Sequence, residues 1–303
     1  MRKAGETVKD KFASYHPVIN FTFFLGALIC GMLLLHPAFL FCSVILSMGY
    51  YLTVQGRRGL KMVFHLLLLF ALLSVINPLF NTYGKTVLFT YLGGRTYTLE
   101  ALGYGMALAA MMVSVLFWFA SYNAVMTSDK FLYLFGSLAP SVTLVLTMVL
   151  RLLPLYRDKA VQMNSARRCI GKDAKTGAKK EQAEHGMTIL SALTSWALEG
   201  GVITADSMRS RGYGCGKRSS FSLYRFEGRD KSLLSFMTAL LGIVIFCCLH
   251  GGASVVYTPV YQAAGVDNPF MPVGVAAYFL FLFLPSAVNV WEEIRWCSLK
   301  SKI

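Results

Sequence analysis

Charged residues are scarce in this sequence. They make up 15% of the 303 residues, and acidic residues are the scarcer kind, with 15 Asp and Glu against 29 Lys and Arg. Soluble domains contain about 25% charged and about 45–50% apolar residues. Here 55% of the residues are hydrophobic, and the mean hydropathy is +0.54. The composition excludes an ordinary soluble domain and predicts an integral membrane protein.

Glycine-rich nucleotide loops are also missing. Neither G-x-x-x-x-G-K-[ST] nor G-x-G-x-x-G occurs, because the stretch GYGCGK (212–217) has the wrong spacing. Such loops hold phosphate with the N–H groups that begin a helix, whereas these glycines follow a predicted helix. We expect this chain to bind no ATP, Mg²⁺ or other cofactor, so that any ATP hydrolysis belongs to another subunit.

Metal-binding and catalytic patterns are lacking as well. The seven cysteines show no C-x-x-C spacing, and the five histidines are scattered without H-E-x-x-H or a comparable grouping. Most cysteines lie in apolar runs or in basic segments. We predict free thiols, no metal site and no catalytic residues.

Long apolar runs are what the sequence does contain. A membrane-spanning helix needs about 20 mostly apolar residues, and six runs approach that length. The prediction is an all-α polytopic membrane protein with about six transmembrane helices. The runs are Val18–Leu35, Ala38–Val54, Met62–Ile76, Leu102–Ala120, Leu233–Leu249 and Val273–Val290.

Basic residues lie between these runs in a pattern typical of membrane topology. They gather at the N-terminus, in GRRGLK (56–61), throughout 151–231 and in RWCSLKSKI (295–303). Cytoplasmic loops carry the excess of Lys and Arg, so these segments and both termini are predicted to be cytoplasmic. Without interleaved aromatic residues or a reading motif, the charge does not indicate nucleic-acid binding.

Residues 131–150 are hydrophobic enough to cross the membrane, but a crossing would place the basic block 151–231 outside. The interpretation favoured here is a helix pair, broken around Pro140, at or partly in the cytoplasmic leaflet; a seventh crossing is the alternative. The predicted organisation is therefore N-terminal membrane helices in 1–121, coupling helices in 122–231 and C-terminal membrane helices in 232–303.

The cytoplasmic block reads as two amphipathic helices. Periodic apolar residues predict one helix after Pro154 that ends near Arg168, then a flexible polar loop over 171–184. A second helix is predicted from about Met187. Its end is expected at Gly212 or Gly214, since glycine adopts the left-handed conformation that ends helices.

The segment that opens the first of these helices and the motifs that end both helices resemble those of a known protein family. Leu150, Arg151 and Pro154 open a segment that resembles the transmembrane T component of energy-coupling factor (ECF) transporters, the EcfT/CbiQ family. In that family two short Ala-Arg-Gly motifs end two coupling helices. They correspond here to Ala166-Arg167-Arg168 and Ser210-Arg211-Gly212. Arg168 replaces the expected glycine, so that helix must continue further or end differently.

The resemblance implies a non-catalytic subunit in a bacterial plasma membrane. By similarity, Arg167 and Arg211 would each insert into one of two ABC-type ATPases and pair with an acidic side chain. A membrane S component would bind the substrate, a vitamin or a transition-metal ion such as cobalt. Ile189, Leu193 and Trp196 form an apolar stripe that faces either this S component or the rest of the same chain.

Two other classes remain as alternatives. A self-contained permease would need polar residues in the middle of its spans, and a polytopic membrane enzyme would need clustered acid, base or metal ligands at one face. The spans carry almost no such residues. Trp118, near the end of the fourth run, is expected at the lipid interface.

The predicted topology is testable by thiol labelling. A membrane-impermeant maleimide applied to whole cells should leave Cys169 and Cys215 unmodified, because both lie in the basic block. The same reagent should modify them after the membrane is permeabilised. Labelling of either residue from outside contradicts the topology.

Overall fold

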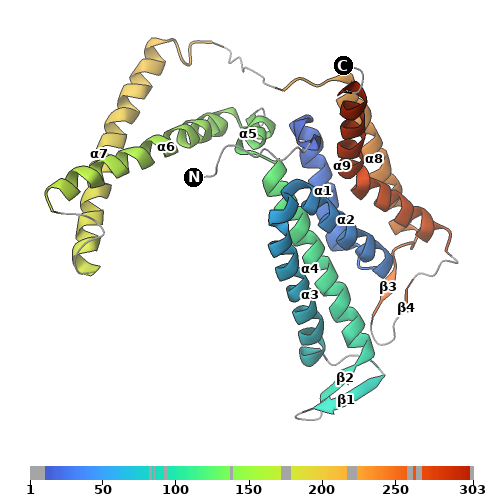
Figure 1. The fold of residues 1–303 in the computed structure, drawn as a ribbon. Helices are drawn as coiled ribbons and strands as arrows, with labels where there is room; N and C mark the ends of the chain where they lie inside the picture. Colours follow the sequence, from blue (N-terminus) through green and yellow to red (C-terminus); the bar gives the residue numbers. More distant parts are fainter. Residues whose placement is uncertain are drawn as a thin grey trace. The chain divides into compact units, whose positions relative to one another are not determined.

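The computed structural model describes residues 11–81, 84, 86–91, 95–136, 139–171, 179–216, 224–257, 262–263 and 268–300. The predicted basic N-terminus before Lys11, residues 172–178 of the predicted loop 171–184 and the pair Lys217-Arg218 lie outside these ranges. The chain forms two compact units, 1–131 with 224–303 and 132–223 (Figure 1). The first unit therefore combines the predicted regions 1–121 and 232–303.

The all-α prediction is confirmed. Helices α1 to α4 span Pro17–Leu33, Pro37–Gln55, Leu60–Phe80 and Leu99–Val125, and α5 to α9 span Ser128–Gly136, Pro140–Cys169, Lys179–Ser210, Gly228–Leu249 and Phe270–Lys300. Two short antiparallel pairs connect them: β1 (Val87–Tyr91) with β2 (Arg95–Thr98), and β3 (Val255–Val256) with β4 (Gln262–Ala263). Short 3-10 turns cover Phe12–Ser14 and Gly56–Gly59.

Among the described residues, five helical segments are long and apolar enough to cross a membrane, and α1 is a shorter apolar helix. One of the five, Pro37–Phe80, contains α2, the turn at Gly56–Gly59 and α3. The six predicted runs thus fall in α1 to α4, α8 and α9. Residues 140–169 also meet the criterion as α6, and the break before Pro140 is where the sequence placed it.

Two His-Pro pairs begin the first two membrane helices in the same way. Proline occupies the first helical position, where its missing N–H costs nothing. The Nδ1 atoms of His16 and His36 accept hydrogen bonds from the backbone N–H groups of Val18 and Ala38, each at 3.3 Å. Both histidines are buried. The His-Pro dipeptide therefore starts both helices in the same way, and the sequence contains this signal twice.

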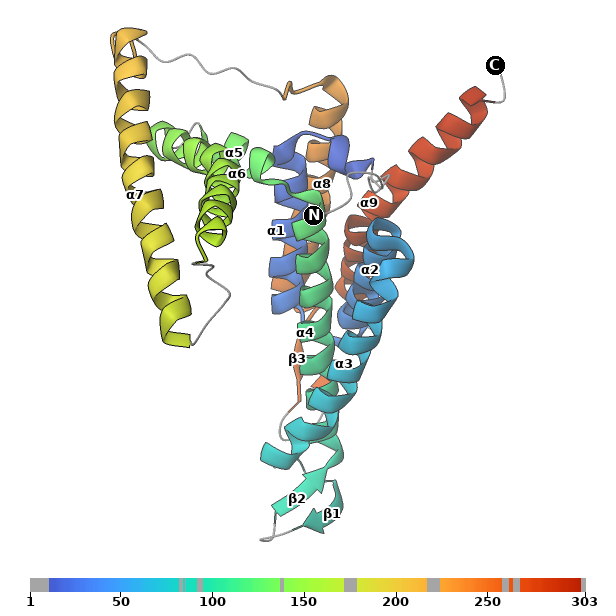
Figure 2. The same cartoon turned by 60° about the vertical axis from the view of Figure 1, so that its left-hand side comes forward.

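Helix α4 is the centre of the first unit, because α1, α2 and α3 all pack against it. Figure 2 shows α3 and α4 side by side. Pro78 lies inside α3 and leaves the carbonyl of Ser74 without its usual helical donor. Gly105 of α4 lies against that carbonyl, and a Cβ there would come within 3.0 Å of the oxygen. Glycine thus permits the close approach of these two helices.

An aromatic cluster joins α4 to α1 and α9. Trp118 is fully buried, with its ring centroid 5.4 Å from that of Phe23 and 5.9 Å from that of Tyr50. Phe23 in turn contacts Phe281 of α9 at 5.2 Å. The expectation that Trp118 anchors the protein in the lipid interface is wrong. The ring fills the space where the helices meet, which a sequence pattern of apolar residues cannot distinguish from a lipid-facing position.

We predict that Trp118→Ala destabilises the protein by about 3–5 kcal/mol, because it leaves a large cavity among aromatic rings. The measurement is equilibrium unfolding of the purified protein in detergent. Trp291→Ala is the matched control, since that ring on α9 is 59% exposed. Equal losses from the two substitutions would contradict the central role of Trp118.

Candidate functional site

The residues of the two family motifs lie at the ends of the two long helices of unit 132–223. Ala166, Arg167 and Arg168 belong to the last turn of α6, which ends at Cys169. Ser210 is the last residue of α7, and Arg211 and Gly212 follow it directly. Lys and Arg are favoured at helix C-termini, where the carbonyl groups carry partial negative charge. Both motifs thus present arginine at a helix end.

Helix α6 ends differently from the family pattern. Arg168, which stands where glycine was expected, keeps a helical conformation, and the helix continues to Cys169. The left-handed residue is Gly171, at φ 73°, and its N–H donates to the carbonyl of Arg168 at 3.0 Å. The substitution therefore moves the helix end by a few residues towards the next glycine.

Helix α7 ends in a Schellman arrangement. Gly212 has φ 80°, its N–H donates to Arg209 O at 3.0 Å, and the Tyr213 N–H donates to Met208 O at 3.0 Å. Of the two predicted ends, Gly212 and Gly214, the helix takes the first. Arg211 occupies the capping position, with its side chain exposed. The backbone at this motif is fixed by hydrogen bonds, whereas the guanidinium faces solvent.

Two expectations for these helices are wrong. Helix α6 does not begin after Pro154: it begins at Pro140 and contains both Arg151 and Pro154. Pro154 is exposed, and helix-forming leucine and arginine surround it, so one missing hydrogen bond is tolerated. Helix α7 begins at Lys179, so residues 179–184 are helical and not part of a loop.

Helices α6 and α7 cross each other, and their side chains meet in a seam (Figure 1). The rings of Tyr156 and Trp196 meet edge to face with centroids 5.6 Å apart, and the Lys159 ammonium lies 5.5 Å from the Trp196 ring centre. One end of the seam is polar: Arg167 Nη2 lies 3.1 Å from His185 Nδ1. The number of residues from Tyr156 to Arg167 on α6 equals the number from His185 to Trp196 on α7. Both contacts therefore belong to one register of the two helices.

The apolar stripe of α7 turns towards this seam. Ile189, Leu193 and Trp196 are half-buried, and of these Trp196 contacts Tyr156 directly. Of the two alternatives for the stripe, packing within the chain therefore applies to Trp196. A second set of apolar residues on α7 is more than half exposed: Met187, Leu190, Leu198, Val202 and Ile203.

Helices α6 and α7 bury no residue completely. Their contact is a narrow seam, and large hydrophobic side chains of both helices face outwards. Hydrophobic surface of this extent is typical of a region that contacts a membrane or another protein. The Arg167 Nε is enclosed, with no hydrogen-bond partner among the described residues. The geometry suits a surface that a partner completes.

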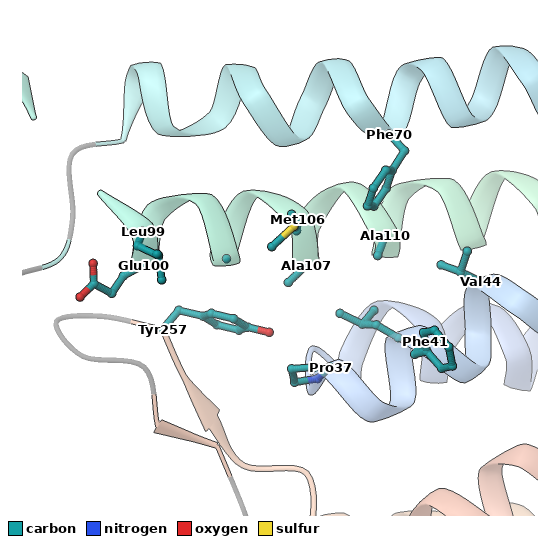
Figure 3. Close-up of a pocket in the computed structure, with 12 residues that line it drawn as sticks. Pro37, Phe41, Val44, Phe70, Leu99, Glu100, Met106, Ala107, Ala110 and Tyr257 are labelled. Atoms are coloured by element: carbon teal, nitrogen blue, oxygen red, sulfur yellow. The ribbon is translucent and has the colours of Figure 1, made fainter. Parts of the chain in front are cut away.

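An apolar groove of about 470 Å³ lies in the first unit, between α2, α3, α4 and the segment after β3 (Figure 3). Its two polar side chains have partners within the chain. Tyr257 Oη donates to Leu35 O at 2.7 Å, and the Glu100 carboxylate accepts from Thr86 Oγ1 at 2.6 Å. The remaining lining is apolar, including Phe41, Phe70 and Met106. Sites for small molecules normally present placed polar groups, and this lining does not.

The apolar helices define a multi-pass membrane protein with a distinct helical unit inserted between its membrane helices. Its sequence places it in a known family. Residues 9–222 match the family model CbiQ, cobalt transport protein, and the chain belongs to that family. The match covers α1 to α7 and both arginine motifs. None of the curated proteins compared with the chain matches it.

His185 is a contact residue that the sequence did not reveal. It lies in the polar stretch KKEQAEHG (179–186), and nothing in the pattern singles it out. Its role follows only from the register of α6 and α7, which brings it to Arg167. A helical period continued upstream from Trp196 and Ile189 would have placed residue 185 on the same face.

The register predicts a disulfide between Met163→Cys and Ile189→Cys, because both positions are half-buried and lie between the two observed contact pairs. The experiment uses a chain with Cys169→Ser and Cys215→Ser, mild oxidation and a mobility shift. The matched control is Val161→Cys with Leu190→Cys, both exposed, which should not cross-link. Equal cross-linking of the two pairs would refute the register.

Proposed function

We propose that this protein is the non-catalytic coupling subunit of an ECF-type ABC transporter. Two cytoplasmic ABC-type ATPases would bind ATP and Mg²⁺ and contact the ends of α6 and α7. A membrane S component would bind the substrate, a vitamin or a transition-metal ion. Because the family is described as a cobalt transport protein, Co²⁺ is the first substrate to test. The carrying observation is that Arg167 and Arg211 end two long, largely exposed helices of a single unit.

The chemistry of the two arginines supports contact with an acidic partner. The planar guanidinium matches a carboxylate, and a desolvated pair can cost about 2–5 kcal/mol when truncated. An exposed pair contributes far less, about 0–1 kcal/mol, so the contact would need a groove that excludes water. Arg167 is partly exposed at the end of α6, and Arg211 is exposed beside a fixed backbone turn.

The positions of buried charges disfavour the permease alternative. Among the described residues, Glu100 and Asp230 are buried in the first turns of α4 and α8, and Lys130 is buried in the short helix α5. Charges that handle a substrate lie along the middle of membrane helices or line a cavity there. These three lie at helix ends, and Glu100 is engaged by Thr86. The described spans thus supply a scaffold more readily than a permeation path.

We predict that Arg167→Ala with Arg211→Ala reduces the recovery of ABC-type ATPases by at least about tenfold in a pull-down of the tagged protein from its native membrane, because two charge-assisted contacts are removed. Uptake of radioactive Co²⁺ into the same cells, with vitamins as further probes, should fall in parallel. Identification of each co-purifying protein by mass spectrometry provides the readout.

Arg157→Ala with Arg209→Ala is the matched control. It removes the same charge from exposed positions on the same helices and should retain the ATPases. If the wild-type protein brings down no ATPase, or if the double variant retains both, the coupling role is rejected. The self-contained permease then becomes the leading interpretation, ahead of a membrane enzyme.

A further inference from the structure

Lys130 has an unusual environment for a lysine. Its side chain is 7% exposed, although it carries an ammonium group that is costly to bury without partners. The Nζ atom donates to the carbonyls of Ala13 at 2.5 Å and Val125 at 3.1 Å. When the Asn20 side-chain amide is oriented so that both its oxygen and its nitrogen have hydrogen-bond partners, Asn20 Oδ1 accepts the third bond from Lys130 at 3.1 Å. Since an ammonium has three N–H groups, each has an acceptor.

These three acceptors come from three different places in the chain. Val125 ends α4, Asn20 belongs to the first turns of α1, and Ala13 lies in the 3-10 turn Phe12–Ser14. Lys130 therefore fastens the end of α4 and the beginning of α5 to the segment that precedes α1. It does so one residue before the chain leaves the first unit, which ends at Phe131 on this side.

The returning connection reaches the same short segment. The chain re-joins the first unit at Tyr224, and the Phe226 ring lies 4.4 Å from that of His16, centroid to centroid. The Arg229 guanidinium lies 5.3 Å from the Tyr15 ring centre. The Tyr224 ring lies 6.4 Å from that of His16, so the returning connection reaches the segment that Lys130 holds.

The segment Lys11–His16 is itself held firmly. The backbone N–H groups of Lys11 and Phe12 both donate to Asn289 Oδ1 of α9, at 2.9 and 3.0 Å. Phe12 is fully buried, with its ring 5.4 Å from that of Phe23 in the aromatic cluster. At its other end, His16 caps α1. A displacement of this segment would therefore disturb its contacts with α1, α4 and α9 together.

We propose that Lys130 and the segment Lys11–His16 form the joint through which motion of residues 132–223 enters the membrane helices. The inference rests on the proposed coupling function. Lys130 acts as a positioning residue: it makes the connection at Phe131 rigid, so that a movement of the inserted unit is passed on and not absorbed by bending of α5. Arginine at 130 would preserve the charge and the donors, whereas methionine would preserve only the length.

The test measures deuterium exchange in the purified complex of this protein and its co-purifying ATPases. Exchange in the presence of a non-hydrolysable ATP analogue and Mg²⁺ is compared with exchange in the presence of ADP. Exchange reports local opening of backbone hydrogen bonds. In the wild type we expect nucleotide-dependent changes in 132–223 and at the ends of α1 and α4 near the joint. In Lys130→Met the changes in 132–223 should persist, while those in α1 and α4 should shrink by about threefold or more, as expected for a released local contact.

Three variants complete the design. Lys130→Arg should behave like the wild type, and Lys61→Met controls for the loss of an exposed lysine. Asn289→Ala breaks the joint at its other attachment and should reproduce the effect of Lys130→Met. ATP hydrolysis and subunit composition should be unchanged in all three and in Lys130→Met.

The joint is rejected if Lys130→Met transmits nucleotide-dependent changes to α1 and α4 as the wild type does. It is also rejected if both Lys130→Met and Asn289→Ala fail to assemble, because the contacts then serve folding alone. The coupling function fails separately, if the wild-type complex shows no nucleotide-dependent change in 132–223 or contains no ATPase.

Discussion

The packing of aromatic rings around Trp118 is the contact on which the membrane unit depends. Within a bilayer, lipid is as apolar as leucine, so helices associate through shape and close contact and gain little from hydrophobic burial. Phe23, Tyr50 and Trp118 interlock three helices, and Phe281 adds a fourth. Phe12 extends the cluster to the N-terminal segment. The same rings that hold the helices together thus fix the segment to which both connections of residues 132–223 are attached.

Residues 132–223, in contrast, are packed sparsely. Helices α6 and α7 share a narrow seam and bury no residue, so their conformation relies on helix ends, on Trp196 against Tyr156 and on Arg167 beside His185. Local stability of this kind is low compared with a packed core, and segments that move in function are drawn from the less stable parts of proteins. A rigid anchor and a lightly packed lever are what a coupling subunit would require.

Much of this could be predicted because the signals are local. Apolar runs set the membrane helices, Pro140 marks a break, and Gly212 ends α7, since each depends on the residue's own backbone preferences or on its hydropathy. The predictions fail at Pro154 and at the start of α7, because the continuity of an exposed helix overrides local residue preferences there. Arg168 shows the intermediate case: the sequence indicated a changed helix end, and the structure located it at Gly171.

The sequence by itself determined that this is a membrane protein, where its apolar membrane helices run, and which arginines end the two long helices of residues 132–223. Only the tertiary structure decided that Trp118 faces the core, that His185 meets Arg167, and that Lys130 is buried against Ala13, Val125 and Asn20. The physical reason is that hydropathy and backbone preference belong to single residues. The partners of an ammonium or an indole come from residues far apart in the chain, and only the packed helices bring them together.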